Sequence, residues 1–475
     1  MTNEALRGKS DAGNQKTAVL VPLVALASLA EAAIWVPTTG GHLDASENWT
    51  DMTSSTFAIR KAQSAPFTIS KDGASLPGSG SLRYDFVACW HTNDFGSGMT
   101  FALPNRSLAV ADGAKVRQVS GVISTFADTS ITAGASESSG IDVSGPGSGF
   151  VTKGLSLSAP ASAGEGVSPF LTISDGANFT SRGTVNNLIG SVYLGGNAKL
   201  TVDGANFDCP GSVHVGIEGA DNVFAVSNGS HVVCGSVYVY SNNLFSVEGS
   251  MVVLSNFVAV STHGKAVFKK SAVDTLVTNA NHQLTFGGDD GTLLLEDSSV
   301  AIGYRSHMQG TNFTFKVVNT TIEHTPDAWF LTGANANETV ELSRRLVFGG
   351  TNSLLRITGS KGLYLRGGVL AFEIPDGGFP LDRAVVELTN PSARFSGEDL
   401  ASHVIEVSVS DRCPNGDYTL LKGTFTSEFK AKFLEREGAL VANGDRHSFI
   451  VATEGGWDVL KIRVRNRVGM VLVFR

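Results

Sequence analysis

Three residues at matching places in a repeated phrase are candidates for molecular recognition. In each phrase two apolar residues flank one odd residue, which is Tyr193, His214, Tyr238 or, in a fourth copy, Ala259. Because side chains alternate along a strand, the flanking residues are expected to point inward and the odd residues outward. Stacked strands would align Tyr193, His214 and Tyr238 in one outward row, which we call the aromatic column. Such a column either stiffens the sheet by cross-strand packing or binds glycan rings or a partner surface.

The cysteines suggest a second contact between repeats. The four cysteines Cys89, Cys209, Cys234 and Cys413 form no CxxC pair, which excludes a zinc knuckle and a thioredoxin-type motif. Cys209 precedes its Gly-Ser-Val phrase by two residues and Cys234 by one, so we expect them on adjacent coils. Parallel neighbours in register lie about 4.8 Å apart, within the roughly 4.4–6.8 Å that a disulfide needs. The sequence is compatible with a disulfide between Cys209 and Cys234 and equally with two buried thiols.

Carboxylates provide the only candidates for acid–base catalysis. Asp289 and Asp290 lie near Glu296 and Asp297 in the sequence. However, the run of Gly and Asp residues at 287–291 primarily indicates a turn. The alternative function is a carbohydrate-active enzyme of pectin-lyase-like fold, a polysaccharide lyase or glycoside hydrolase, which needs clustered carboxylates. The chain contains no HxH, HExxH or GxSxG motif and no phosphate-binding loop. The sequence therefore predicts a non-enzyme with no catalytic, cofactor-binding or metal-binding residues.

Two interleaved phrases indicate the elements that would position these residues. The Gly-Ser-Val phrase starts at 190, 211 and 235, with a variant at 256, so the intervals are 21, 24 and 21 residues. An apolar alternating triplet followed by polar residues or Gly interleaves with it. Copies of this triplet phrase lie at 171–176, 200–204, 224–229 and 245–249, with altered copies at 293–297 and 315–319. Each phrase is too short for a stable sheet alone, whereas stacked coils form a parallel sheet with a continuous core.

The pattern predicts an all-β fold, a right-handed parallel β-helix (β-solenoid) with a C-terminal β-module. Gly and Asn are expected at corners that need positive φ. An ordinary β-sandwich with accidental similarity is the other interpretation. Composition supports a packed fold, because 42% of the residues are hydrophobic and only 17% are charged. The net charge of −8 comes without a Lys/Arg cluster, so no nucleic-acid partner is expected.

The N-terminal residues 1–32 have the layout of a secretory signal peptide. A polar segment with Arg7, Lys9 and Lys16 precedes the apolar run 17–30, and Ala30-Glu31-Ala32 matches a small-x-small cleavage pattern. The run is too short to span a bilayer, and no other run approaches about 20 apolar residues. We therefore expect export with cleavage near Ala32, no transmembrane span in the mature chain, and a secreted or outer-surface location.

The remaining chain divides into three expected parts. Residues 33–165 form an N-terminal cap and an irregular β-solenoid, in which 107–113 resembles the triplet phrase. Residues 166–400 form the regular solenoid. Residues 401–475 form a β-module with one short helix within 427–437, ended by Gly438. Its strands are expected at 404–409, 418–421, 448–452, 459–464 and 470–474.

These features resemble secreted β-helical proteins of Gram-negative bacteria. The solenoid phrases, the Trp35, Gly40-Gly41 and Asn48-Trp49 segment, and Gly-Asp-Tyr-Thr-Leu-Leu at 416–421 are similar to autotransporter passenger regions and autotransporter-associated β-strand repeat proteins. The resemblance implies an exported, surface-exposed, adhesive or structural protein. The chain departs from that pattern because residues 401–475 are typical of a soluble module rather than of a C-terminal membrane barrel. We expect a cell-surface structural or adhesion protein whose partners are surface glycans or cell-surface proteins.

Overall fold

The structure is a computed structural model that describes strands β1 to β8 in the first 133 residues and then residues 138–466 with short gaps. The gaps are 153, 160–165, 182–189, 256–257, 276–283, 288, 304–305, 332–343 and 445. Most of the expected signal peptide lies outside the described residues, as do Cys89, the Trp35 to Trp49 segment and the expected strand 470–474. None of the helices in the described part of the chain has the length and apolar character that a membrane crossing needs.

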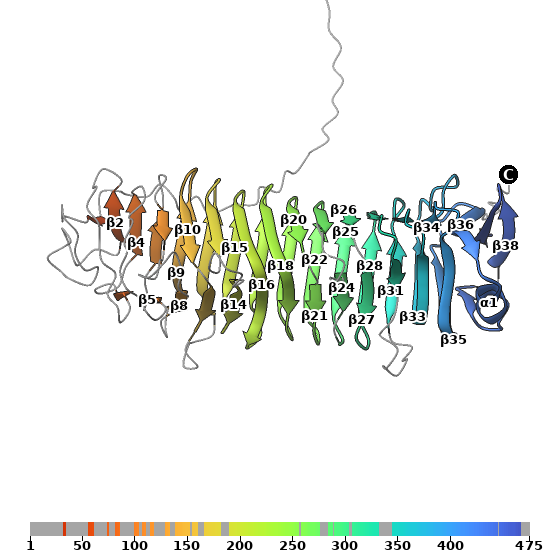
Figure 1. Ribbon diagram of the computed structural model, residues 1–475, viewed down its shortest axis with the longest axis horizontal. Coiled ribbons are helices and arrows are strands. Elements are labelled where there is room, and N and C mark those ends of the chain that lie inside the picture. Colours follow the sequence, from red (N-terminus) through yellow and green to blue (C-terminus); the bar gives the residue numbers. More distant parts are fainter. Residues whose placement is uncertain are drawn as a thin grey trace, which may run out of the picture.

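The chain winds as a parallel β-helix, in which strands pair with the strands one coil before and one coil after (Figure 1). The pairings form three series, which we call the first, second and third faces. The predicted β-solenoid is therefore confirmed. Figure 1 shows the coils stacked along the long axis of the molecule, from β2 at one end to β38 at the other.

The strands of each face follow in chain order. The first face contains β1 (Ala32–Ile34), β2 (Thr56–Arg60), β4 (Ser81–Asp85), β6 (Ser107–Val110), β9 (Ser139–Ser144), β12 (Pro169–Ser174), β15 (Lys199–Asp203), β17 (Val223–Ser227), β19 (Leu244–Glu248), β22 (Lys265–Lys269), β25 (Thr292–Glu296), β28 (Thr314–Val318), β31 (Arg345–Gly349) and β37 (Leu440–Ala442). The second face contains β7 (Lys115–Arg117), β10 (Gly149–Thr152), β13 (Asn178–Ser181), β20 (Met251–Leu254), β23 (Ala272–Thr275), β26 (Ser299–Ile302), β29 (Thr321–His324), β32 (Leu354–Ile357) and β34 (Val386–Leu388). The third face contains β3 (Ala74–Ser75), β5 (Met99–Leu103), β8 (Thr129–Ala133), β11 (Leu155–Ser158), β14 (Val192–Gly195), β21 (Val258–Val260), β24 (Leu284–Gly287), β27 (Ser306–Gln309) and β30 (Trp329–Leu331). Longer strands turn a corner and serve two faces: β16 (Asn206–Glu218), β18 (His231–Val239), β33 (Gly362–Ile374), β35 (Arg394–Val409) and β36 (Gly416–Phe425).

The register of the first face agrees with the triplet phrase. Leu171 is paired with Leu200, Leu200 with Phe224, and Phe224 with Phe245. Strand β6, which is the described part of residues 107–113, lies on the same face, because its Leu108 pairs with Ile141 of β9. Alternation explains the burial, since Leu171 and its partners point into the coil.

From β6 onward, each described coil contributes to three faces, whereas the sequence shows two regular phrases. The two phrases correspond to the first and third faces. The second face has no equally regular phrase, and in β16 and β18 its residues continue into the third face within one strand. Without a separate turn signal between the two faces, sequence periodicity does not separate them.

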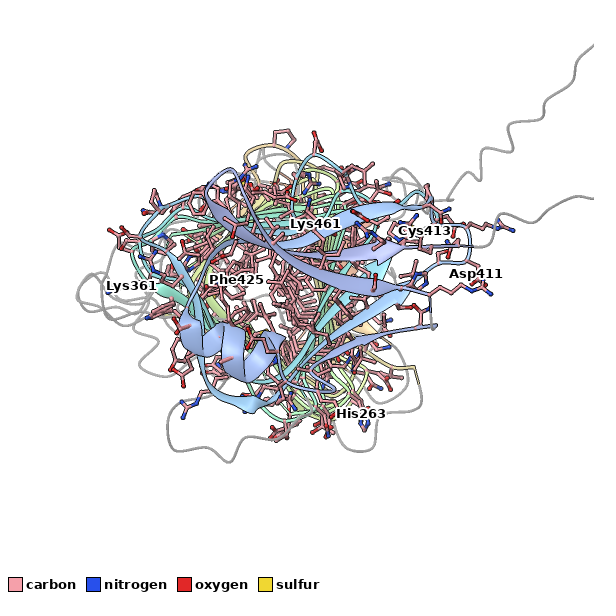
Figure 2. All side chains as sticks on the ribbon, turned by 90° about the vertical axis from the view of Figure 1, so that its right-hand side faces the viewer. His263, Lys361, Asp411, Cys413, Phe425 and Lys461 are labelled. Carbon is pink, nitrogen blue, oxygen red and sulfur yellow. The ribbon has the colours of Figure 1, made fainter. Side chains whose placement is uncertain are left out.

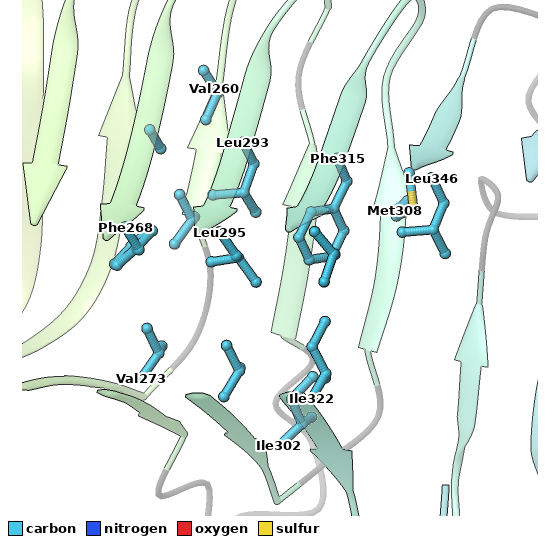
Figure 3. Packing of buried hydrophobic residues seen from close by; sticks show 14 of the residues in the cluster. Val260, Phe268, Val273, Leu293, Leu295, Ile302, Met308, Phe315, Ile322 and Leu346 are labelled. Carbon is cyan, nitrogen blue, oxygen red and sulfur yellow. The ribbon is translucent and has the colours of Figure 1, made fainter. Parts of the chain in front are cut away.

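The core is a set of side-chain columns that run along the solenoid. Leu293, Phe315 and Leu346 are successive register partners on the first face. Figure 3 shows these side chains in one buried cluster with Ile302 and Ile322 of the second face and Met308 of the third face. Aromatic rings also stack: the centroids of Phe224 and Phe245 are 4.9 Å apart, with 18° between the ring planes. Each coil thus covers the apolar side chains of the next, which a single coil could not do.

Two corners of the coil require positive φ, as predicted for Gly and Asn. Between the first and second faces, φ is positive at Asp175, Asn228, Lys270, Asp297 and Asn319. Between the third and first faces, φ is positive at Asp221, Asn242, His263, Asp290 and Asn312. The neighbouring coil holds even the unfavourable residues there, since the Lys270 N–H donates to the Glu296 carbonyl at 2.9 Å and the His263 N–H to the Asp290 carbonyl at 3.0 Å.

Buried polar ladders satisfy backbone N–H groups at these corners. On one side, the N–H of Ser250 donates to Ser271 Oγ at 3.3 Å, and the N–H of Ser271 donates to Ser298 Oγ at 3.1 Å. On the other side, Asn222 Oδ1 accepts from the Ala198 N–H at 2.7 Å, and Asn243 Oδ1 accepts from the Asn222 N–H at 2.8 Å. Unpaired buried N–H groups are costly, so these side chains help to define the stacking of the coils.

The C-terminal end of the solenoid is covered by an antiparallel sheet and a short helix (Figure 2). Strand β39 (Trp457–Val464) pairs antiparallel with β36 on one side and with β38 (Ser448–Glu454) on the other. The expected helix is present as α1 (Ser427–Phe429), followed by the π-helix η2 (Lys430–Leu434). It ends at Leu434, before the expected stop at Gly438. Phe425 and Phe429 contact each other at 5.2 Å between ring centroids and help to close the core.

Candidate recognition surface on the third face

The aromatic column forms on the third face in the expected register. Tyr193 of β14 pairs with His214 of β16, and His214 pairs with Tyr238 of β18, whose next partner is Ala259 of β21. The Tyr193 and His214 ring centroids are 4.8 Å apart with 19° between the planes, and those of His214 and Tyr238 are 4.6 Å apart with 5°. The flanking residues such as Val213 are fully buried, so the predicted alternation is confirmed.

The orientation of the rings limits which surfaces are open. Because the three rings are stacked nearly parallel, each internal ring face is covered by the neighbouring ring. His214 is sandwiched between the two tyrosines, and both His214 and Tyr238 are half-buried. Tyr193 is 37% exposed. The column therefore offers ring edges along its length and a ring face at its ends.

Tyr240 extends this surface and follows directly after β18. Its hydroxyl oxygen lies 3.0 Å from Nδ1 of His214, and the two ring centroids are 6.0 Å apart. The repeated phrase does not predict a role for Tyr240, which lies just outside it. Its position two residues after Tyr238, on the same side of the strand by alternation, is the signal that would have identified it.

Burial favours the uncharged forms of His214, Tyr238 and Tyr240. Burial lowers the pKa of His214 and raises the pKa values of Tyr238 and Tyr240. The surrounding third-face segments contain one acidic residue, Glu218, and no Lys or Arg. These segments are 155–158, 192–195, 212–218, 236–240 and 258–260. The arrangement suits uncharged rings and apolar surfaces better than ions.

Two of the candidate catalytic carboxylates, Asp289 and Glu296, have structural partners. Asp289 accepts hydrogen bonds of 2.8 Å from both the N–H and Oγ1 of Thr311, which hold the pKa of its carboxyl below the ordinary value. Glu296 forms a 3.0 Å ion pair with Lys269. A general acid needs a raised pKa instead. Within the described ranges, no group of three or more His, Cys, Asp or Glu side chains is placed to hold a metal ion.

Cys209 and Cys234 are register partners on the second face, so the predicted contact across one coil step is confirmed. Both are fully buried, and both are free thiols. Burial raises the pKa of the Cys209 thiol to about 12 and that of the Cys234 thiol well above its ordinary value. Because the thiolate is the reactive form, neither group is suited to nucleophilic chemistry.

Comparisons of this chain with models of protein families, with characterised proteins and with solved structures found no significant match.

Proposed function

We propose that this chain is an exported, non-enzymatic β-solenoid that acts at the outer cell surface as a structural or adhesion protein. The observation that carries the proposal is the aromatic column, which lies outside the core on a stretch of the third face with almost no charge. Inward positions already supply the apolar contacts for stacking, as Val192 and Leu194 do on either side of Tyr193. A partly exposed ring in that place is therefore available for an external partner.

The solenoid would present this surface without reorganisation. Backbone pairing in register holds each coil, so the relative positions of Tyr193, His214 and Tyr238 are set before any partner binds. Preorganisation of this kind reduces the entropic cost of association. The partners that we propose are surface glycans or cell-surface proteins, for which aromatic side chains are efficient contacts.

The hydrogen bonds of Asp289 and the ion pair of Glu296 favour recognition over polysaccharide cleavage. Both carboxylates stabilise corners and strands, and the lowered pKa of Asp289 opposes a role as general acid. A lyase or hydrolase would still be identified by release of new chain ends from polysaccharide, and that result would contradict the proposal.

Cell binding by the full chain tests the adhesive role. The double variant Tyr193→Ser/Tyr238→Ser should lose binding to intact cells or immobilised cell-wall glycan while its melting temperature stays near that of the parent. Tyr364→Ser is the matched control, since Tyr364 is a half-buried outward tyrosine on the same face in β33. Unchanged binding with lowered stability would leave the column a structural role only.

Localisation is tested separately. The proposal expects protein recovered from the cell exterior to begin after a cleavage near Ala32, as N-terminal sequencing would show. A product that stays in the cytoplasm and retains Met1 would contradict export.

A further inference from the structure

We infer that the aromatic column binds an uncharged hexopyranose unit at one place, the ring face of Tyr193 that is directed toward β11. This inference rests on the recognition role proposed above and names its ligand class and its site. The other rings of the column hold Tyr193 in position rather than binding sugar themselves.

The stack determines which ring face is free. One face of Tyr193 is covered by His214, whose centroid is 4.8 Å away. On the opposite side the register partner of Tyr193 is Ser156 of β11. A serine side chain is too short to cover a phenol ring, in agreement with the 37% exposure of Tyr193. A flat ligand ring placed over Ser156 would therefore continue the stack by one coil step of about 4.8 Å.

The opposite end of the column is less open. Tyr238 has Ala259 as its next register partner, which is also small. However, Tyr240 lies beside Tyr238 with 6.4 Å between ring centroids, and Tyr238 is less exposed to solvent than Tyr193. Tyr193 is the one ring of the column with the exposure of a surface residue, so the ligand is assigned to that end.

The surroundings of this face match the chemistry of a sugar ring. Pyranose rings have an apolar C–H face that packs on aromatic rings and a rim of hydroxyl groups. Ser156 and Ser158 are the half-buried outward residues of β11, and Ser156 is the register partner of Tyr193. Their hydroxyl groups both donate and accept hydrogen bonds, as sugar hydroxyls require. Ring stacking and a hydroxyl-lined floor together favour a pyranose over a purely apolar ligand.

Charge excludes acidic sugars as the preferred ligand. The third-face segments around the column contain no Lys or Arg to pair with a carboxylate or sulfate. Their one charged residue, Glu218, is the register partner of Gly195, two residues after Tyr193. A uronate or sulfated unit would gain no ion pair here and would be repelled by Glu218. The ligand class is therefore a neutral hexopyranose.

His214 acts as the positioning residue. Its Nδ1 lies 3.0 Å from the Tyr240 hydroxyl oxygen, which restrains the imidazole ring, and Tyr238 packs on its other face at 4.6 Å. The imidazole in turn supports Tyr193 from behind. The column thus holds the Tyr193 ring with its plane perpendicular to the column axis, so that one more ring can stack on it.

Two matched variants of the full chain test the site. Ser156→Tyr would extend the stack and cover the free face of Tyr193 without removing any residue of the column. Ala259→Tyr would extend the stack equally at the opposite end. The probes are neutral hexasaccharides of glucose, mannose, galactose and N-acetylglucosamine, with polygalacturonate as the acidic comparison. Binding is measured by calorimetry and folding by thermal melting.

We expect Ser156→Tyr to weaken binding of the preferred neutral hexasaccharide about tenfold or more, which is about 1.4 kcal/mol. Ala259→Tyr should leave the affinity within about twofold, and both variants should melt at or above the parent temperature because a stacked ring is added. Equal loss in both variants, parental affinity in Ser156→Tyr, or tighter binding of polygalacturonate would overturn the inference. Cell binding that persists without affinity for any neutral hexasaccharide would also overturn it and leave the proposed function standing. If the parent protein itself shows no cell binding, the proposed function is rejected instead.

Discussion

Cys209 and Cys234 lie opposite each other in register on β16 and β18, and both thiols are fully buried. Both side chains belong to the hydrophobic core of the solenoid. We predict that neither thiol reacts with a thiol-specific disulfide reagent in the native protein, because burial raises the pKa of Cys209 to about 12 and the thiolate is the nucleophile. Peptide mapping before and after denaturation measures this, and rapid native labelling of either cysteine would contradict it.

Substitution of Cys234 gives a second prediction on the same contact. Cys234→Ser should be about 1–3 kcal/mol less stable than Cys234→Ala, since the buried hydroxyl must be desolvated. Denaturant unfolding of the two variants provides the comparison, and the alanine variant serves as the control for lost volume. Equal midpoints would mean that the serine finds a partner that the native thiol does not need.

The phenylalanine stack of the first face should contribute strongly to stability. Phe245 is fully buried, 4.9 Å from Phe224 and 5.3 Å from Phe268 between ring centroids. We expect Phe245→Ala to lower the free energy of unfolding by about 3–5 kcal/mol, because it removes a buried ring and leaves a cavity. Ser246→Ala, at the adjacent outward position, should change it by less than about 0.5 kcal/mol. Similar effects of the two changes would argue against the inward direction of Phe245.

The asparagine ladder should be sensitive to a charge of nearly the same shape. Asn222 Nδ2 donates to Asn243 Oδ1 at 3.0 Å, and the side chain is buried. Asn222→Asp replaces this donor by a carboxylate that faces an acceptor, so we expect a loss of about 3–5 kcal/mol at neutral pH from the uncompensated buried charge. Asn242→Asp is the control, since Asn242 is an exposed corner residue with φ of 58° and Asp also tolerates that conformation. Thermal melting should separate the two variants clearly, and a melting temperature shared by both would refute the ladder's role.

The C-terminal end should weaken in mild acid because of His403. Its imidazole is fully buried, and burial lowers its pKa to about 4, against the opposing effect of a hydrogen bond with Gly368 and with a minor contribution from the Arg436 charge. Between pH 6.5 and about 4 the unfolded chain binds a proton that the folded chain does not, so stability falls as pH falls. The loss across that window is about 3 kcal/mol for a fully buried histidine with this shift.

Removal of the titrating group checks this account. His403→Gln should flatten the dependence of unfolding free energy on pH between about 4 and 6.5. His231→Gln, at an exposed position in β18, should leave the slope as in the parent. A parental slope in His403→Gln would show that other groups cause the acid sensitivity.

Several features of the fold follow from local sequence alone. The partners Leu200 and Phe224, Tyr193 and His214, and Cys209 and Cys234 were predictable from repeated phrases, because alternation has a period of two and each coil repeats the one before. Corner positions were predictable from Gly and Asn, although His263 and Lys270 adopt positive φ without that signal. Neighbouring coils hold those two residues there.

Other features depend on contacts that no phrase encodes. The second face was missed because β16 and β18 pass from one face to the next without a turn residue that separates them. The burial of His403 arises only when residues near Arg436 fold back over the last coil. The sequence determined that Tyr193, His214 and Tyr238 share an outward column, since side-chain direction is a property of the strand. Only the tertiary structure decided that their rings cover one another and leave the Tyr193 face open, because ring orientation depends on the side chains of adjacent coils.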